Sequence, residues 1–288
     1  MFGVDFSAAR DAGKHIWVCR AHPGEDGIRI ESVDPLSDLP GGAAPRAEAM
    51  PALVAKVIES PRSAWGFDFC FALPAAMIDA LAPAAAGHAT QLEVMSLWHD
   101  AATLRARCRQ AGEGRELRRR TDREARAPFS PCSLRMYRQT FHGMVHVLRP
   151  LRRRPEVAVL PFDRLAATAD DGERLPFNRA AGGQQPHVYL MEVRPASLLR
   201  ALELPASGYK GLGAGPAAGR QAIFRHLTAA GLVRPTARAL RRRIIEQPGG
   251  DALDAVLAAV SAWRGYRGHD HAALRQDADF GREGFVYV

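Results

Sequence analysis

Acidic residues recur in this sequence at the ends of short apolar runs, where a strand would deliver a side chain to the edge of a sheet. Asp5 follows the run M-F-G-V, Asp68 follows S-A-W-G-F, and Glu192 follows H-V-Y-L-M. Asp251 and Asp254 begin the segment D-A-L-D-A-V-L-A-A, whose helical spacing puts both acids on one face. Carboxylate oxygens are the ligands that Mg²⁺ and Mn²⁺ prefer, so these five residues are the candidate metal ligands.

The chemistry that such a set could perform is two-metal hydrolysis of a phosphate ester. Two divalent ions about 4 Å apart require several carboxylates, because phosphate oxygens must reach both ions. On this hypothesis Asp5 bridges two Mg²⁺ or Mn²⁺ ions, and Asp68 and Glu192 each ligate one. Asp254 completes the site from the helix, with Asp251 beside it. The alternative roles are structural, since a strand-end aspartate can start a turn and Asp251 can cap its helix.

Hydrophobic periodicity and turn residues place these acids on an α/β framework with a mixed sheet. The order of the first elements is β-β-β-α-β: an antiparallel meander, an amphipathic helix and a further strand. The middle of the chain is helical, and we interpret 83–150 as a helical insertion into a single domain spanning 1–288. The predicted strands are 1–6, 15–20, 28–33, 63–69, 156–162, 187–193 and 284–288. The predicted helices are 46–60, 92–109, 133–148, a helix starting at Pro195, and 220–231, 234–245 and 251–264.

Three basic residues are candidates for contact with a substrate phosphate. Lys210 lies within the glycine-rich segment 208–219 and Arg220 directly follows it; the segment lacks the residues of a nucleotide-binding P-loop. Arg123 belongs to the Arg-rich stretch 115–126, whose alternative interpretation is a solvated helix face. His142 and His146 are four residues apart, but Gly143 stands where a zinc protease requires glutamate, so helix packing or phosphate contact is favoured.

Composition favours a soluble protein that could meet an anionic partner. The formal net charge is +8 and the hydrophobic content is 47%, so nucleic acid is a possible partner. Only three of the 39 basic residues are lysines, and this arginine bias makes each arginine cluster less informative. The four cysteines form no C-x-x-C pair, which favours reduced thiols. Without a signal peptide or an apolar stretch of ~20 residues, we expect a cytoplasmic protein and no membrane partner.

Several phrases in order along the chain resemble domain-of-unknown-function family 429. They are G-V-D-F-S (3–7), G-F-D-F-C-F-A-L-P (66–74), R-Q-T-F-H-G (138–143), E-V-R-P-A-S-L-L-R-A-L (192–202), Y-K-G (209–211), D-A-L-D-A-V-L-A-A (251–259) and E-G-F-V-Y-V (283–288). The resemblance implies a ribonuclease H-like fold and a metal-dependent nuclease, with acidic site positions at Asp5, Asp68, Glu192 and Asp254. One departure is Phe69-Cys70, where the family pattern has an Ala-Pro-type segment.

The sequence therefore favours a metal-dependent phosphodiester hydrolase, a nuclease that acts on nucleic acid by a two-metal mechanism. Two alternatives stay open. One is a ribonuclease H-like module that binds nucleic acid or protein without cleaving it, and the other is a hydrolase of small phosphate esters. The choice between RNA and DNA and the oligomeric state are left open.

Overall fold

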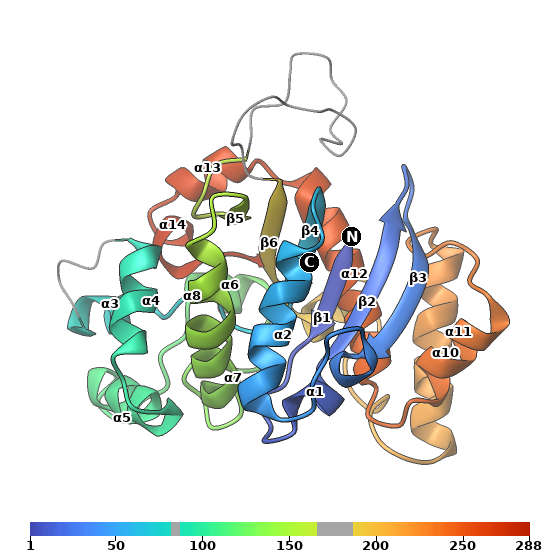
Figure 1. Ribbon diagram of the computed structural model, residues 1–288, viewed down its shortest axis with the longest axis horizontal. Helices are drawn as coiled ribbons and strands as arrows, with labels where there is room; N and C mark the ends of the chain where they lie inside the picture. Colours follow the sequence, from blue (N-terminus) through green and yellow to red (C-terminus); the bar gives the residue numbers. More distant parts are fainter. Residues whose placement is uncertain (82–86, 166–186) are drawn as a thin grey trace.

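A mixed sheet forms the centre of the computed structural model, which describes residues 1–81, 87–165 and 187–288 (Figure 1). Its strands follow the order β3-β2-β1-β4-β6-β5, and β7 pairs with β6. The strands are β1 Phe2–Asp5, β2 Trp17–Pro23, β3 Ile28–Pro35, β4 Ser63–Phe67, β5 Val157–Val159, β6 Val188–Val193 and β7 Val286–Tyr287. The predicted insertion start near 83 and most of the loop after Phe162 lie outside the described residues.

The pairing directions confirm the expected α/β class with antiparallel strands followed by parallel ones. β1 pairs antiparallel with β2, which pairs antiparallel with β3, whereas β4, β5, β6 and β7 join the sheet through parallel pairs. β1 lies between β2 and β4 and is covered on both faces. This burial explains why its sequence is almost continuously apolar.

The predicted helices are present in the expected order, several of their bounds differ, and one predicted strand is shorter than expected. The helix expected over 92–109 is two helices, because Asp100 caps a new helix by accepting a hydrogen bond from the Thr103 amide at 2.8 Å. The helix expected from 220 begins earlier, at Ala214, and so takes up part of the predicted glycine-rich loop. The strand expected over 156–162 is short and ends at Val159. The helical elements are α1 Ala12–His15, η1 Leu36–Asp38, α2 Arg46–Ile58, α3 Ala75–Leu81, α4 His88–Ser96, α5 Ala101–Ala111, α6 Arg120–Glu124, α7 Tyr137–His142, η2 Gly143–Leu148, α8 Arg149–Arg152, α9 Pro195–Ala201, α10 Ala214–Ala229, α11 Arg238–Glu246, α12 Asp251–Gly268, α13 His271–Gln276 and α14 Phe280–Glu283.

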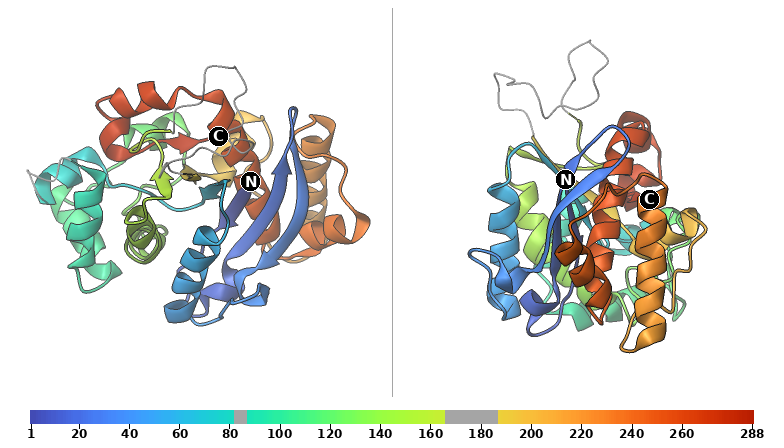
Figure 2. Two further views of the ribbon diagram at one scale, coloured as in Figure 1. Left: turned by 45° about the horizontal axis from the view of Figure 1, so that its top comes forward. Right: turned by 90° about the vertical axis from the view of Figure 1, so that its right-hand side faces the viewer.

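Two helical layers cover the two faces of the sheet (Figure 2, right). α2 and part of the helical middle pack on one face, and α12 packs on the other. A Cβ atom on Gly3 would lie 2.1 Å from the backbone nitrogen of Ala259, so β1 and α12 approach to backbone contact. This close approach brings the start of α12 to the carboxyl end of β1. None of the helices in the described part of the chain is long and apolar enough to cross a membrane.

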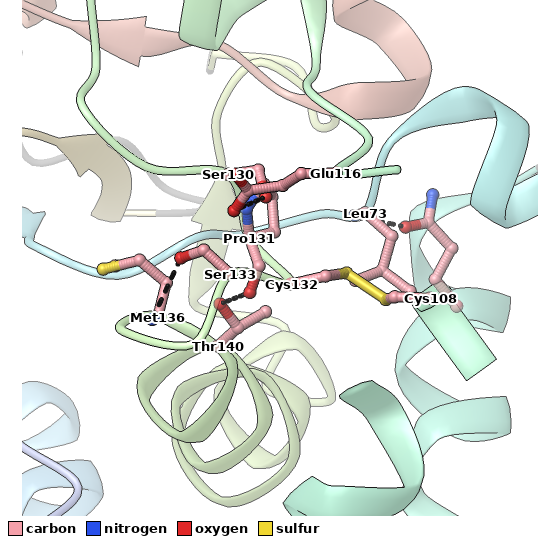
Figure 3. The surroundings of a disulfide bond; sticks show 10 residues. Leu73, Cys108, Glu116, Ser130, Pro131, Cys132, Ser133, Met136 and Thr140 are labelled. Atoms are coloured by element: carbon pink, nitrogen blue, oxygen red, sulfur yellow. Dashed lines mark hydrogen bonds between the residues drawn. A yellow bond between two sulfur atoms is a disulfide. The ribbon is translucent and has the colours of Figure 1, made fainter. Parts of the chain in front are cut away.

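A disulfide joins Cys108 of α5 to Cys132, and the expectation of reduced thiols is therefore wrong for this pair (Figure 3). The turn that carries Cys132 is held by the Thr140 hydroxyl, which donates to the Pro131 carbonyl at 2.7 Å. Cys19 and Cys70 are free and buried, as expected. No local pattern predicts the bond, because its partners are 24 residues apart and come together only when α5 packs on α7.

Replacing Cys108 with serine is expected to lower the unfolding free energy by about 3 kcal/mol, because the cross-link restricts the unfolded chain. Urea unfolding under oxidising conditions measures the change. Wild-type protein treated with a reducing agent is the control and should unfold at the same urea concentration as the variant. Equal midpoints for variant and oxidised wild type would show that the cross-link adds no stability.

Candidate active site

The strand register brings Asp5 and Asp68 to one level of the sheet. Val4 is opposite Phe67 in the parallel pair of β1 and β4, so the next residue on each chain is one of the two acids. The Asp68 amide continues this ladder by donating to the Val4 carbonyl at 3.0 Å. Gly3 lies against α12, and side chains alternate along a strand, so Asp5, two residues later, faces α12 as well. The carboxyl edge of the two central strands is thus acidic on the α12 side.

Asp5 is the most isolated acid of this edge. It is only 9% exposed, and in the described part of the chain its carboxylate has neither a hydrogen bond nor an ion pair. Burial, and then the neighbouring Asp254, raise the pKa of Asp5 well above its usual value, with Lys210 acting against them and with Asp251 and Asp68 adding to the rise. A buried carboxylate without a partner is costly, and a cation would relieve that cost.

Asp254 comes to Asp5 from the first turn of α12 and is fixed by the chain around 209–210. The Tyr209 hydroxyl donates to its Oδ1 at 2.7 Å, and the Lys210 ammonium contacts its Oδ2. Burial raises the pKa of Asp254 to about 6, although the ion pair with Lys210 and the Tyr209 hydrogen bond oppose the rise. Burial alone would lower the pKa of Lys210, but Asp254 and Asp5 raise it, so this side chain carries its charge at the site.

Asp68 is held from the neighbouring strand by Arg194. The Arg194 Nη1 donates to Asp68 Oδ1 at 2.7 Å, and its Nη2 reaches Glu192 Oε1 at 3.2 Å and the Cys70 thiol. Asp68 is more exposed than Asp5, at 22% of its side chain. Arg194 thus holds one carboxylate oxygen of Asp68, and the other oxygen accepts no hydrogen bond from the described residues.

Glu192, which the sequence placed among the metal ligands, does not join this cluster. It pairs in register with Phe67, one residue before Asp68, so it faces the side of the sheet that carries the helical middle. Both of its oxygens are taken: Oε2 accepts from Arg119 Nη1 at 2.7 Å and from the Phe71 amide at 2.8 Å, and Oε1 accepts from Arg119 Nη2 and from Arg194.

Arg119 is the buried partner that the sequence interpretation missed. The sequence left the stretch 115–126 open between phosphate contact and a solvated helix face, yet Arg119 and Asp122 are fully buried. Arg119 Nη2 donates to Asp122 Oδ1 at 2.7 Å, so one guanidinium neutralises two buried acids. Only the folded arrangement distinguishes Arg119 from the arginines around it, because the charge pattern of the stretch is uniform.

Arg220, expected to contact a phosphate, instead bonds the loop at Tyr209 to the end of α11. It is 2% exposed, and its guanidinium donates to the carbonyls of Tyr209 at 2.7 Å and Ile245 at 2.6 Å. Its role in the structure is therefore to hold the segment that carries Lys210. Arg123 is exposed on α6 and donates to the Arg118 carbonyl at 2.9 Å, outside the acidic cluster.

Asp251, the fifth expected ligand, lies at the margin of the cluster. Its backbone amide and its Oδ2 both bond the Gln247 side-chain amide, at 2.8 and 3.0 Å. Its charge reaches Asp5, whose pKa it helps to raise. Asp251 therefore adds negative charge near Asp5, but its own carboxylate is bonded to Gln247 and lies at the edge of the cluster.

The three carboxylates are suitable ligands for a hard divalent cation, although two of them already form ion pairs with basic side chains of the protein. Asp5, Asp68 and Asp254 offer carboxylate oxygens from one face of the sheet, and Asp5 has no protein partner in the described ranges. As the side chains stand, no three His, Cys, Asp or Glu residues within those ranges converge closely enough to hold a metal ion. Lys210, whose side chain is 52% exposed, must leave Asp254 for the three carboxylates to share a cation.

No family model, no curated protein and no solved structure matches this chain.

The contribution of Asp254 to the stability of the metal-free protein is expected to fall as the pH rises from about 4 to 6. Asp254 has a higher pKa folded, about 6, than unfolded, near 4, so in this range the folded chain binds more protons than the unfolded chain. The ionisation penalty is absent below pH 4 and complete above pH 6. Its size is on the order of a few kcal/mol.

Urea unfolding of wild type and Asp254→Asn at pH 4, 6 and 7.5 measures this penalty. The difference in unfolding free energy between the two proteins isolates Asp254 from acids with lowered pKa, such as Asp122, that act in the opposite direction. We expect the variant to gain on wild type between pH 4 and 6 and to keep that gain at pH 7.5. A difference that does not change with pH would contradict the assignment.

Proposed function

We propose that this protein is a metal-dependent phosphodiester hydrolase that cleaves nucleic acid at Asp5, Asp68 and Asp254, with Mg²⁺ or Mn²⁺ as cofactor. The observation that carries the proposal is Asp5, a buried carboxylate that lies beside two further acids and has no hydrogen-bond or ion-pair partner among the described residues. Such an arrangement is unfavourable in an empty fold, and it is the arrangement that divalent metal chemistry on phosphate needs.

The sheet supports the proposal in a second way. Three antiparallel strands followed by parallel ones, with an acid ending the first strand, match what the resemblance to domain-of-unknown-function family 429 and to the ribonuclease H-like fold implies. The register of Glu192 requires one revision to the expected ligand set. In the two-ion form of the proposal, Asp5 would be a ligand of both ions, and Asp68 and Asp254 would each complete one of them. Glu192 would position Arg194.

The surrounding residues have distinct parts in this proposal. When bound, the divalent cation supplies positive charge that stabilises the anionic transition state and activates water. Tyr209 keeps Asp254 oriented through its hydroxyl, and Arg194 does the same for Asp68. Lys210, once released from Asp254, has an exposed ammonium at the mouth of the site that can contact a phosphate oxygen of the substrate.

One observation favours a second candidate, a module that binds nucleic acid without cleaving it. Lys210 pairs with Asp254, and Arg194 pairs with Asp68. Of these three acids, Asp5 alone has no ion pair within the described residues. A fold that had lost its metal could be stabilised by this pairing.

Incubation with Mn²⁺ or Mg²⁺ and labelled RNA, DNA, hybrid and branched substrates, beside Asp5→Asn, separates the candidates. Divalent-dependent cleavage by wild type that the variant lacks supports the proposed hydrolase. Binding without cleavage by both proteins supports the second candidate. Turnover of mononucleotide esters alone would assign the site to small phosphate esters instead.

A further inference from the structure

The helix α11 carries a concentrated positive charge on the side that faces solvent. The chain from 214 to 246 contains seven arginines and a single acid, Glu246. Leu240 and Ile244 turn inward, four residues apart, and Ile244 is fully buried. By helical periodicity the opposite side is formed by Arg238, Arg241 and Arg242, which we call the α11 basic face; all three are exposed.

Two of the three arginines of the α11 basic face, Arg238 and Arg241, have no partner among the described residues. Arg242 pairs with Glu246 at 2.8 Å. Arg238 and Arg241 make no hydrogen bond or ion pair to any residue within 1–81, 87–165 and 187–288. The acids near α11 are engaged elsewhere, since Glu246 pairs with Arg242, and Asp34 and Asp38 pair with Arg243. The exposed pair Arg238 and Arg241 therefore creates a local field that attracts anions.

The Arg-rich stretch of the helical middle differs, because its guanidinium groups bond to the protein itself. Arg119 is buried between two acids, and Arg118 bonds the Ala127 carbonyl. Arg120 pairs with Glu124 and Asp277, at 2.7 and 3.1 Å. The sequence expectation that this stretch holds a nucleic-acid backbone is therefore less well supported than the same role for α11.

The end of α11 is joined to the segment that carries Lys210. Arg220 bonds both the Ile245 carbonyl, at the end of α11, and the Tyr209 carbonyl, and the Gly211 amide donates to the Pro248 carbonyl at 2.8 Å. Figure 1 shows α10 and α11 side by side next to β3, with α11 leading into α12. The helix that carries the basic face is thus joined at its C-terminal end to the segment that carries Lys210.

We propose that the α11 basic face binds the sugar–phosphate backbone of the nucleic-acid strand that is cleaved at Asp5. The inference rests on the proposed hydrolase function and names the surface that selects a polymer over a mononucleotide. Arg238 and Glu246 are about 12 Å apart along the helix axis at 1.5 Å per residue. This length spans about three to four phosphates of one strand, counted along a duplex axis. A polymer can therefore contact α11 and the acids together, whereas a mononucleotide reaches only one of them.

Fluorescence anisotropy with a 5′-labelled 20-nucleotide DNA strand, and with RNA of the same sequence, tests the surface in EDTA at 50 to 300 mM salt. Arg238→Gln/Arg241→Gln is expected to weaken binding roughly ten-fold at 100 mM salt. It should also reduce the slope of log affinity against log salt by about 1.4, since each phosphate contact on a single strand contributes about 0.7. The matched control is Arg109→Gln/Arg123→Gln, two exposed arginines of the helical middle, which should bind like wild type.

Two results would overturn the inference: unchanged affinity and slope in the α11 variant, or an equal loss in the control variant. The parallel arms with DNA and RNA show which backbone is preferred. Cleavage by the same proteins keeps the two proposals distinguishable. Loss of binding in the α11 variant when no substrate is cleaved supports the surface and refutes the hydrolase. Cleavage that requires Asp5, with binding unchanged in the α11 variant, refutes the surface and leaves the hydrolase in place.

Discussion

Asp5→Asn is expected to abolish divalent-dependent hydrolysis while making the metal-free protein more stable. The amide cannot replace the charged ligand, so the rate should fall by roughly 10³-fold, the size of effect seen when a site loses one electrostatic contact to the transition state. The same change removes a buried carboxylate that lies close to Asp254 and has no hydrogen bond or ion pair with any described residue. The unfolding free energy should therefore rise by about 1 kcal/mol or more at pH 7.5.

Opposite changes in activity and stability distinguish a metal ligand from a structural aspartate. Rates with Mn²⁺ and urea unfolding in EDTA give the two readouts. Asp251→Asn is the matched control, because Asp251 is bonded to Gln247 at the margin of the cluster and should retain most of the activity. An Asp5→Asn protein that is less stable than wild type would identify Asp5 as a structural residue.

Arg119→Met is expected to give the largest loss of stability. The change leaves Glu192 and Asp122 buried without their shared cation, and breaking a buried ion pair from one side costs about 3–5 kcal/mol. Urea unfolding measures the loss. Arg120→Met, next along the chain, is the matched control. Its side chain is 38% exposed and its ion pairs with Glu124 and Asp277 lie nearer to solvent, so it should change the midpoint much less. Similar midpoints for the two variants would mean that the buried network adds no more stability than a surface pair.

Glu192→Gln tests the revised role of Glu192. Gln keeps the shape, but its single oxygen can accept either from Arg194, at the Oε1 position, or from the Phe71 amide, at the Oε2 position. The variant should therefore lose stability to urea but keep a substantial part of the divalent-dependent rate. A positioning role predicts an unchanged affinity for Mn²⁺. A ligand role predicts that Mn²⁺ binding is lost together with activity, as in Asp5→Asn.

The elements that carry Asp5, Asp68 and Asp254 were predictable because each depends on local signals. Apolar runs bounded by turn residues gave the strands, and the i,i+3 acids at 251 and 254 gave the start of the helix. Small residues along α12 let this helix lie close to the sheet, as the contact of Ala259 with Gly3 shows. Between Pro74 and Pro150 the described residues form helices joined by turns and loops, with no strand among them.

The parts that could not be predicted depend on contacts between distant segments. Glu192 faces the wrong side for the cluster because β6 aligns it with Phe67, and a shift of one residue would have reversed its face. Nothing in the local sequence fixes that register across more than a hundred residues. The burial of Arg119 and the bond between Cys108 and Cys132 likewise follow from how the helical middle packs on the sheet.

Titration of Mn²⁺ into the metal-free protein by calorimetry tests the central claim most directly. We predict saturable binding to wild type at pH 7.5, and no measurable binding to Asp5→Asn under the same conditions. Binding should weaken as the pH falls through 6, because protons then compete for Asp254, whose pKa is about 6. Equal binding of Mn²⁺ to both proteins, or none to wild type, would contradict a metal site built on Asp5.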